Sequence, residues 1–449
     1  MNNSLIHGNT IRALLEIAVP VFLTQLVQQL FVTIDSVIVG RYVGATGLAA
    51  IGVTYQIILF TVSLGIGFLM GISVMTGEYA GACDEKGIRK TIAVSVIFVL
   101  MTYAVKLIIG IFFTDKILML TNTPHDVLRE GSRYLRIMFI FGLFTYGYSM
   151  CTYVLRALGD AVRPMYFLLG SSIMNIVLDV LFVGRLGLGV SGAAYATVIS
   201  ESCAMLGCVI YIRKMRPYLI IGLSDFKEIG TTLRYALKLS VPSSLQMCAV
   251  TMSSILVQAA ANSYGTDIVA GLTAAQKVEQ LFTLLVTATG TALMTFVTQN
   301  RGAGASDRVR SGLKLTLIIN IVMAAVVTGL IVLTGPDMLS VFISNSEDKR
   351  LAVISAGMQY FRYTAGFYVI MGISQTLSNY LRGMADAAAP LWIGAVQVAV
   401  NISAILILEP VFGICGIWAS VPLGWAISSI AAVIRVGFRT KPGVKQLDH

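Results

Sequence analysis

The chain has 449 residues, of which 56% are hydrophobic and only 12% are charged, and its mean hydropathy is +0.82. A soluble globular protein has about twice this share of charged residues, so that class is excluded. The net charge of +10 does not indicate a nucleic-acid partner, because most basic residues lie in short segments between long apolar stretches. The composition is that of an integral membrane protein.

Twelve apolar stretches follow one another along the chain, and each is long enough to cross a bilayer as a helix of about 20 residues. They lie at roughly 17–40, 48–75, 91–113, 134–155, 165–184, 190–212, 239–261, 268–297, 313–334, 358–381, 391–409 and 411–434. The alternation of transmembrane β-barrel strands is absent, so each backbone must satisfy its hydrogen bonds within a helix. We therefore predict an all-α polytopic membrane protein.

Short motifs of the first half recur in the second half at an offset near 220 residues. The clearest is Leu-Arg-x-x-(Gly/Ala)-Asp, followed by a proline and, eleven residues later, by an asparagine. The recurring pairs are 155–160 and 381–386, Pro164 and Pro390, Asn175 and Asn401, and 17–20 and 239–242. Such internal symmetry is typical of secondary transporters. We expect an N-lobe at 1–215, a cytoplasmic linker at 216–238, and a C-lobe with a short tail at 239–449.

The basic residues also predict the orientation of the chain. If the N-terminus is cytoplasmic, 21 of the 32 Lys and Arg residues fall in cytoplasmic segments, 8 in external segments and 3 within spans. The positive-inside rule then predicts that both termini are cytoplasmic and that the protein is a multi-pass protein of the plasma (cell inner) membrane. Residues 1–10 are polar and lack a cleavage site, so no signal peptide is expected.

Motifs for enzymatic chemistry are missing from the sequence. No Gly-Lys dipeptide occurs, which excludes a P-loop and ATP hydrolysis through it. His7, His125 and His449 all lie outside the spans, so neither an intramembrane histidine relay nor an HExxH metal site can form. The six cysteines are scattered without CxxC spacing and indicate neither a disulfide framework nor a zinc site. We expect no enzyme, no catalytic residues and no cofactor.

Polar and ionisable side chains inside apolar runs are the informative residues, because burying them in a bilayer costs several kcal/mol. Asp35 lies in the first span, with Gln28 two turns earlier on the same helical face and Pro20 as a candidate kink. Asn175 and Asp179 share one face of the fifth span. Their oxygens could hold a proton or a small hard cation such as Na⁺. The alternative is a set of structural hydrogen bonds between helices.

Further polar residues lie in other spans. Glu201 follows Thr197 by four residues in the sixth span, and the Thr197 hydroxyl could add an oxygen to a cation site. Lys106, in the third span, could pair with a nearby carboxylate or extend its ammonium to the interface. Lys277 and Glu279, at the start of the eighth span, could pair with each other or face a cavity.

The repeat separates common scaffold from chemistry specific to one half. Asn401 is the counterpart of Asn175, but Ile405 stands where the first half has Asp179, and Val257 corresponds to Asp35. The asparagine can thus be explained by a shared scaffold. The two aspartates are an addition to the N-terminal half.

In their order and doubling these motifs resemble the multidrug and toxic compound extrusion (MATE) family, over residues 17–438. The matching residues are Pro20, Gln25, Gln28, Asp35, 30–31, 39–40, 78–82, 299–303, the two Leu-Arg-x-x-(Gly/Ala)-Asp turns, Asn175 with Asp179, and 192–197. The likeness is to the prokaryotic DinF-like branch, because of Asp35, Asn175 and Asp179 and the apolar seventh and tenth spans. It implies twelve transmembrane helices in two pseudo-symmetric six-helix lobes, around a cleft that opens to alternate sides.

The resemblance also implies a function and a site. Such proteins export cationic or amphipathic compounds in exchange for H⁺ or Na⁺, and a monomer suffices. The ion-coupling residues, and the Na⁺ ligands if Na⁺ is the ion, would be Asp35, Asn175, Asp179 and Thr197. Glu201 departs from the family pattern, where a neutral polar residue is expected, and joins Gln28, Lys277 and Glu279 as a candidate cavity or coupling residue. The alternatives are a flippase for lipid-linked oligosaccharides, which the few basic residues inside the spans disfavour, and an exporter of a native metabolite.

Overall fold

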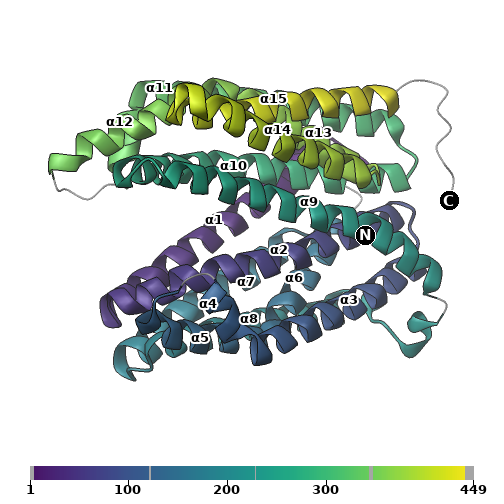
Figure 1. Ribbon diagram of the computed structural model, residues 1–449. Coiled ribbons are helices and arrows are strands. Elements are labelled where there is room, and N and C mark those ends of the chain that lie inside the picture. Colours follow the sequence, from purple (N-terminus) through teal and green to yellow (C-terminus); the bar gives the residue numbers. More distant parts are fainter. Residues whose placement is uncertain (1–4, 121–122, 228, 343–346, 440–449) are drawn as a thin grey trace. The chain divides into compact units, whose positions relative to one another are not determined.

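The computed structural model describes residues 5–120, 123–227, 229–342 and 347–439, and these fold into helices without any strand among them (Figure 1). The helices from the first half of the chain are α1 (Thr10–Tyr42), α2 (Ala45–Gly81), α3 (Glu85–Phe112), α4 (Thr114–Leu120), α5 (His125–Ile140), α6 (Gly142–Ala157), α7 (Val162–Asp179), the π-helix η1 (Val180–Arg185) and α8 (Gly189–Met215). The linker forms η2 (Pro217–Leu219) and η3 (Leu223–Phe226). The helices from the second half are α9 (Gly230–Asn262), α10 (Thr266–Gly302), α11 (Ser306–Ser340), α12 (Glu347–Thr364), η4 (Ala365–Phe367), α13 (Tyr368–Gly383), α14 (Ala388–Phe412) and α15 (Ile414–Arg439).

The prediction of an all-α polytopic membrane protein is confirmed. Among the described residues 10 helices are long and apolar enough to cross a membrane, or 11 if the bent pair α5 and α6 counts as one span. Two predicted spans are not single straight helices. The fourth is bent by 50° between α5 and α6, and the tenth is interrupted by η4 between α12 and α13. Hydropathy averages over such breaks, because the residues at the break are as apolar as their neighbours.

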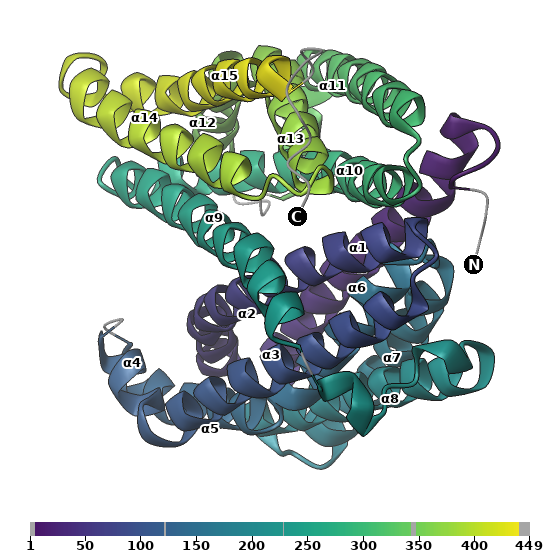
Figure 2. The ribbon, with the colours of Figure 1, turned by 90° about the vertical axis from the view of Figure 1, so that its right-hand side faces the viewer.

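The chain divides into two compact units, and the Leu-Arg-x-x-(Gly/Ala)-Asp motif occurs once in each of them. Most of the first unit is Val19–Ser244, so it includes the linker and the first half of α9. The second unit includes Leu245–Arg301 and the helices α11 to α15, together with Gly8–Ala18 at the start of α1. Within the first unit α7 and α8 lie side by side, and within the second unit α14 and α15 do so (Figures 1 and 2).

The first half of α9 is joined to α2 by serine side chains that donate to the α2 backbone. Ser240 Oγ donates a hydrogen bond to the Phe68 carbonyl oxygen at 3.0 Å, and Ser244 Oγ donates one to the Leu64 carbonyl oxygen at 3.0 Å. Gly71 on α2 makes this approach possible, because a Cβ there would collide with Ser240. One turn of α9 closer to the linker, the Tyr235 hydroxyl donates to Glu78 at 2.8 Å.

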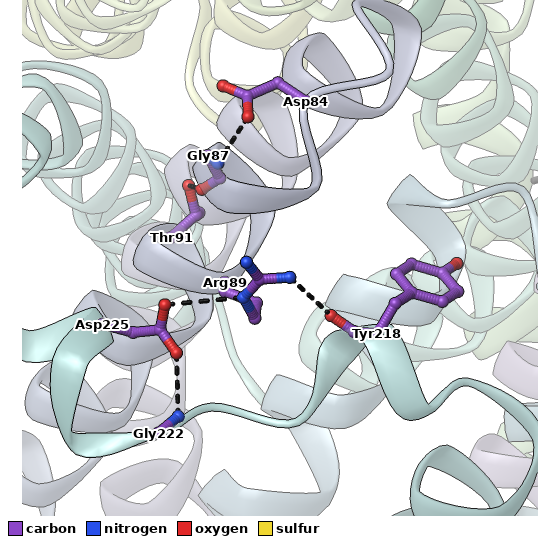
Figure 3. Close-up of polar contacts among 7 residues, drawn as sticks. All are labelled: Asp84, Gly87, Arg89, Thr91, Tyr218, Gly222 and Asp225. Carbon is purple, nitrogen blue, oxygen red and sulfur yellow. Dashed lines mark hydrogen bonds and ion pairs between the residues drawn. The ribbon is translucent and has the colours of Figure 1, made fainter.

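The linker is held on the N-terminal end of α3 by an ion pair and by the hydrogen bonds beside it (Figure 3). Arg89 Nε lies 3.5 Å from Asp225 Oδ1, and an Arg89 Nη atom donates to the Tyr218 carbonyl oxygen at 3.4 Å. The other Asp225 oxygen accepts the Gly222 amide at 2.8 Å, which closes the η3 turn. The α3 end itself is capped by Asp84, whose carboxylate accepts the Gly87 amide at 2.9 Å.

The recurring Leu-Arg-x-x-(Gly/Ala)-Asp motif forms the same helix end in both units. Gly159 has φ 84° after α6, and Ala385 has φ 57° after α13, both in the left-handed region. The following amide closes the cap, from Asp160 to the Leu155 carbonyl at 2.8 Å and from Asp386 to the Leu381 carbonyl at 2.9 Å. This geometry accounts for the repeated motif as a structural signature of each unit.

Candidate functional site

The four predicted ion-coupling residues lie in the first unit on three helices. Asp35 is on α1, Asn175 and Asp179 are on α7, and Thr197 is on α8. Their relative exposures are 6%, 1%, 0% and 5%, so both carboxylates are withdrawn from water although each carries a formal charge. Such burial requires compensation by a partner, an ion or a proton.

Direct contacts join the amide and the hydroxyl. Asn175 Nδ2 donates to Thr197 Oγ1 over a long 3.4 Å, and Thr197 Oγ1 donates to the Ala193 carbonyl oxygen at 3.0 Å. The i and i+4 spacing of Asn175 and Asp179 places both side chains toward α8, which packs against α7. The sequence pattern on α7 is therefore matched by a hydrogen bond to the neighbouring helix.

Four oxygens of the cluster have no protein donor. Within the described part of the chain, Asn175 Oδ1, Asp35 Oδ1 and both Asp179 carboxylate oxygens are buried and accept no hydrogen bond. Buried acceptors of this kind are costly unless a cation or a proton joins them. Carboxylate, amide and hydroxyl oxygens are ligands of hard cations, so this set suits Na⁺ or H⁺.

Asp179 lies where the helix changes its geometry. α7 ends at Asp179, and the π-helix Val180–Arg185 follows at once. π-helical turns are rare and frequently occur at functional sites. This turn could not be predicted from the sequence, because the four residues after Asp179 are apolar and continue the span.

Tyr134 on α5 is a neighbour of the site that sequence reasoning missed. The side chain is buried in the apolar cluster that also contains Ile38 of α1 and Ala193 of α8, the helices that carry Asp35 and Thr197. A tyrosine at the start of a span is ordinarily an interfacial residue, so no local signal distinguishes it. Only the packing of α5 against the neighbouring helices brings it to the carboxylates.

The remaining candidates are distributed differently. Gln28 is exposed on α1, whereas Gln25 is half-buried. Glu201 is half-buried on α8, where Thr145 Oγ1 donates a hydrogen bond to its carboxylate. Glu201 therefore lies within one helical turn of Thr197, a predicted ion-coupling residue. Gln28, in contrast, is exposed and is not buried with Asp35.

Lys277 and Glu279 belong to the second unit and have separate partners. Lys277 is exposed, with Nζ 5.6 Å from the centroid of the Phe342 ring. Glu279 is half-buried and accepts hydrogen bonds from the hydroxyls of Tyr360 at 2.7 Å and Tyr368 at 3.4 Å. The structure therefore does not pair the two residues with each other.

Pro20 lies inside α1, which continues as a helix on both sides of it. The carbonyl of Pro20 accepts a hydrogen bond from Thr24 Oγ1 at 2.7 Å. The boundary between the two compact units falls between Ala18 and Val19, two residues before the proline. A proline removes one backbone hydrogen bond of its helix and so weakens α1 at this boundary.

A multi-pass helical bundle built from two related halves, with ionisable side chains buried in its spans, is the architecture of a membrane transporter. The chain belongs to the MatE family, since residues 20–181 and 242–436 match the sequence profile of that family. The expected MATE membership is thus confirmed, and members of the family are multidrug efflux transporters. The assignment to the DinF-like branch stays a prediction.

Individual relatives agree over most of the chain. The probable multidrug resistance protein YpnP of Bacillus subtilis is 29% identical over 378 residues, or 84% of this chain and 83% of that protein. The probable multidrug resistance protein YoeA of the same organism is 29% identical over 427 residues, or 91% and 90%. The multidrug export protein MepA of Staphylococcus saprophyticus is 21% identical over 431 residues, or 96% and 94%.

Solved structures share the fold. A MOP superfamily transporter from Pyrococcus furiosus superposes with a TM-score of 0.88 at 22% identity, over 97% of each chain. A multidrug resistance MATE family transporter of the MOP superfamily, in an outward-facing conformation, superposes with a TM-score of 0.87 at 22% identity, again over 97% of each chain. At this identity the likeness shows a shared fold.

Proposed function

We propose that the protein is a secondary active antiporter that exports cationic or amphipathic compounds in exchange for H⁺ or Na⁺. The observation that carries this proposal is the buried group of Asp35, Asn175, Asp179 and Thr197, in which acceptor oxygens lack protein donors. Two interacting carboxylates in an apolar unit form a site that a proton or a monovalent cation stabilises. The substrate class rests on the relatives, which are named as multidrug export or resistance proteins.

Coupling follows from the charge of this site. In the empty state the repulsion between Asp35 on α1 and Asp179 on α7 separates the two helices, and an ion bound between them removes the repulsion. The first helix then bends at Pro20, and the substrate is released to the outside. Such an ion drives transport only because it binds one conformation more tightly than the other. Alternating access between the N-lobe at 1–215 and the C-lobe at 239–449 completes the cycle.

The membrane arrangement belongs to the same proposal. The protein acts as a monomer in the plasma membrane, with both termini in the cytoplasm, and it uses no ATP. The linker 216–238 is cytoplasmic and joins the two lobes. The 21 to 8 ratio of basic residues between the predicted sides supports this orientation.

The test measures efflux of ethidium, a fluorescent organic cation, from cells that express wild type, Asp35→Asn or Asp179→Asn. Each strain is measured with and without external Na⁺, and again after a protonophore has collapsed the pH gradient. We expect efflux by both variants to fall to the level of cells without the transporter, and the gradient whose removal stops wild-type efflux identifies the ion. Asp337→Asn, which changes an exposed aspartate of α11, is the matched control and should transport normally.

Wild-type efflux by Asp35→Asn at normal expression would contradict the proposed coupling site. Absence of wild-type efflux across several cationic dyes would instead contradict the substrate class. The flippase and the native-metabolite exporter would then become the better explanations.

A further inference from the structure

A buried ammonium lies in the first unit in addition to the carboxylates. Lys106 of α3 is only 3% exposed, although it lies within an apolar span. Its Nζ is 5.1 Å from the centroid of the Tyr146 ring and 5.2 Å from that of the Phe139 ring. Two aromatic rings within about 6 Å stabilise a cation but do not neutralise its charge.

The break between α5 and α6 makes room for this side chain. α6 begins at Gly142, and a Cβ at that position would come within 3.2 Å of Lys106 Nζ and 3.1 Å of its Cδ. The Tyr103 hydroxyl, one turn before Lys106 on α3, donates to the Ile140 carbonyl oxygen at 2.8 Å at the same break. The C-terminal end of a helix such as α5 also favours a nearby positive charge. The bend and the glycine therefore accommodate the ammonium.

Glu201 carries the opposite charge. It follows Thr197 by one helical turn on α8, and Thr145 of α6 hydrogen-bonds its carboxylate. Lys106 lies against Gly142 of α6, and Thr145, which holds Glu201, follows Gly142 by three residues on the same helix. The ammonium and the carboxylate therefore lie at neighbouring turns of one helix. Through Thr197, one turn away on α8, Glu201 also lies next to the proposed coupling site.

We infer that Lys106 is a built-in counter-ion of Glu201, which confines the binding of the coupling ion to Asp35 and Asp179. The inference rests on the proposed function of that site. Asp35, Asp179 and Glu201 bring three carboxylates into this apolar unit beside the Lys106 ammonium, and an unbalanced charge is costly in such a surrounding. With Lys106 in place, Glu201 needs no ion of its own. Lys106 and Glu201 are positioning residues, since they act on the ion through the charge balance of the unit.

Removal of the Lys106 charge and removal of the Glu201 charge should affect transport in different ways. Without Lys106, the Glu201 carboxylate must take up a proton, so transport should continue at acid pH and fail at alkaline pH. Without Glu201, the Lys106 ammonium is unbalanced and repels the coupling ion. Removal of both charges replaces the pair with two neutral side chains, so the net charge of the first unit is unchanged. The other titratable groups that face Glu201, Tyr134 of α5 and Tyr148 of α6, stay unchanged in all three variants.

The experiment uses the full-length protein in liposomes and records ethidium transport against pH and against Na⁺ concentration. The variants are Lys106→Met, Glu201→Gln and the double variant, with Asp35→Asn in parallel. For Lys106→Met we expect loss of transport on the alkaline side only. For Glu201→Gln we expect the ion concentration for half-maximal transport to rise about tenfold, a typical coupling between sites. The double variant should return to the wild-type ion and pH dependence.

Rescue in the double variant separates charge balance from a structural role, because losing two packing partners would add their defects. If one single variant does not fold, the double variant and Gly142→Ala, which crowds the ammonium but keeps it, still test the inference. Wild-type ion and pH dependence in Lys106→Met, or no rescue in the double variant, would overturn it while Asp35→Asn remained inactive. Normal transport by Asp35→Asn would overturn the proposed function itself.

Discussion

The two units keep an asparagine at the same place of the repeat and surround it with different chemistry. In the first unit Asn175 makes one long contact to Thr197, and its carbonyl oxygen lies buried without a donor among the described residues. In the second unit the Asn401 amide lies 2.9 Å from Ser253 Oγ. The same residue therefore belongs to a polar group with unused acceptors in one unit and to a paired contact in the other.

The counterparts of the aspartates extend this contrast. Val257 replaces Asp35 in the second unit and is part of a core cluster with Phe282 and Trp418, and Ile405, which replaces Asp179, packs against the same cluster. The scaffold thus tolerates apolar side chains at both positions. The repeated fold therefore does not itself require carboxylates at these positions, which agrees with the role proposed for them.

Glu279 of the second unit, unlike Asp179, has hydrogen-bond donors. Glu279 is held by two tyrosine hydroxyls inside an aromatic cluster, with Phe282 and Tyr368 rings 5.3 Å apart and Tyr360 and Trp418 rings 5.3 Å apart. Asp179 has no such donors in the described structure. A satisfied carboxylate stabilises its surroundings, whereas an unsatisfied one is ready to bind an ion.

The asparagine pair gives the largest effect that can test the comparison. Asn175→Ala should raise the ion concentration for half-maximal transport about tenfold, because a ligand oxygen is lost beside Asp179. Asn401→Ala should leave ion dependence unchanged and lower the free energy of unfolding by about 1 kcal/mol, the worth of one hydrogen bond. Both quantities are measured on purified protein, by transport in liposomes and by thermal unfolding in detergent. Equal effects of the two substitutions on ion dependence would remove the distinction between the units.

Glu279→Gln should have a smaller effect. The amide keeps an oxygen for the Tyr360 hydroxyl, so we expect transport within about twofold of wild type and a loss of stability near 1 kcal/mol, as for a weakened hydrogen bond. The Asp179→Asn variant, a carboxylate-to-amide change of the same kind in the first unit, is the matched comparison and should be inactive. An inactive but folded Glu279→Gln protein would mean that the second unit also binds the coupling ion.

The parts of this fold that could be predicted are those determined by a short segment of the sequence. Apolar stretches give the spans, and the repeated Leu-Arg-x-x-(Gly/Ala)-Asp motif predicts a structural turn because its glycine or alanine and its aspartate form one helix end. The bend at Phe141 and the π-turn after Asp179 could not be predicted, since each lies within a continuous apolar run.

The residues of the candidate site could likewise be predicted only in part. A carboxylate within an apolar span is costly, so the sequence predicts Asp35 and Asp179 as site residues, and the structure buries both. The burial of Tyr134 beside α1 and α8, and the position of Lys106 against Gly142, depend on which helices pack together. No single helix encodes that packing. Helical spacing placed Gln28 on the face of Asp35, but the neighbouring helices bury Asp35 and leave Gln28 exposed.

The smallest expected effect concerns helix ends at which one copy of the repeat has a glycine and the other copy does not. Cys83 and Ala385 adopt φ 57°, whereas their counterparts Gly304 and Gly159 have φ 73° and 84°. A side chain in the left-handed region costs about 1 kcal/mol, so Cys83→Gly and Ala385→Gly should each raise stability by up to that amount. Gly304→Ala and Gly159→Ala should lower it similarly, and all four should leave ion dependence alone. Because the four caps are otherwise alike, a thermal unfolding series on the four variants measures backbone strain separately from the chemistry that distinguishes the units.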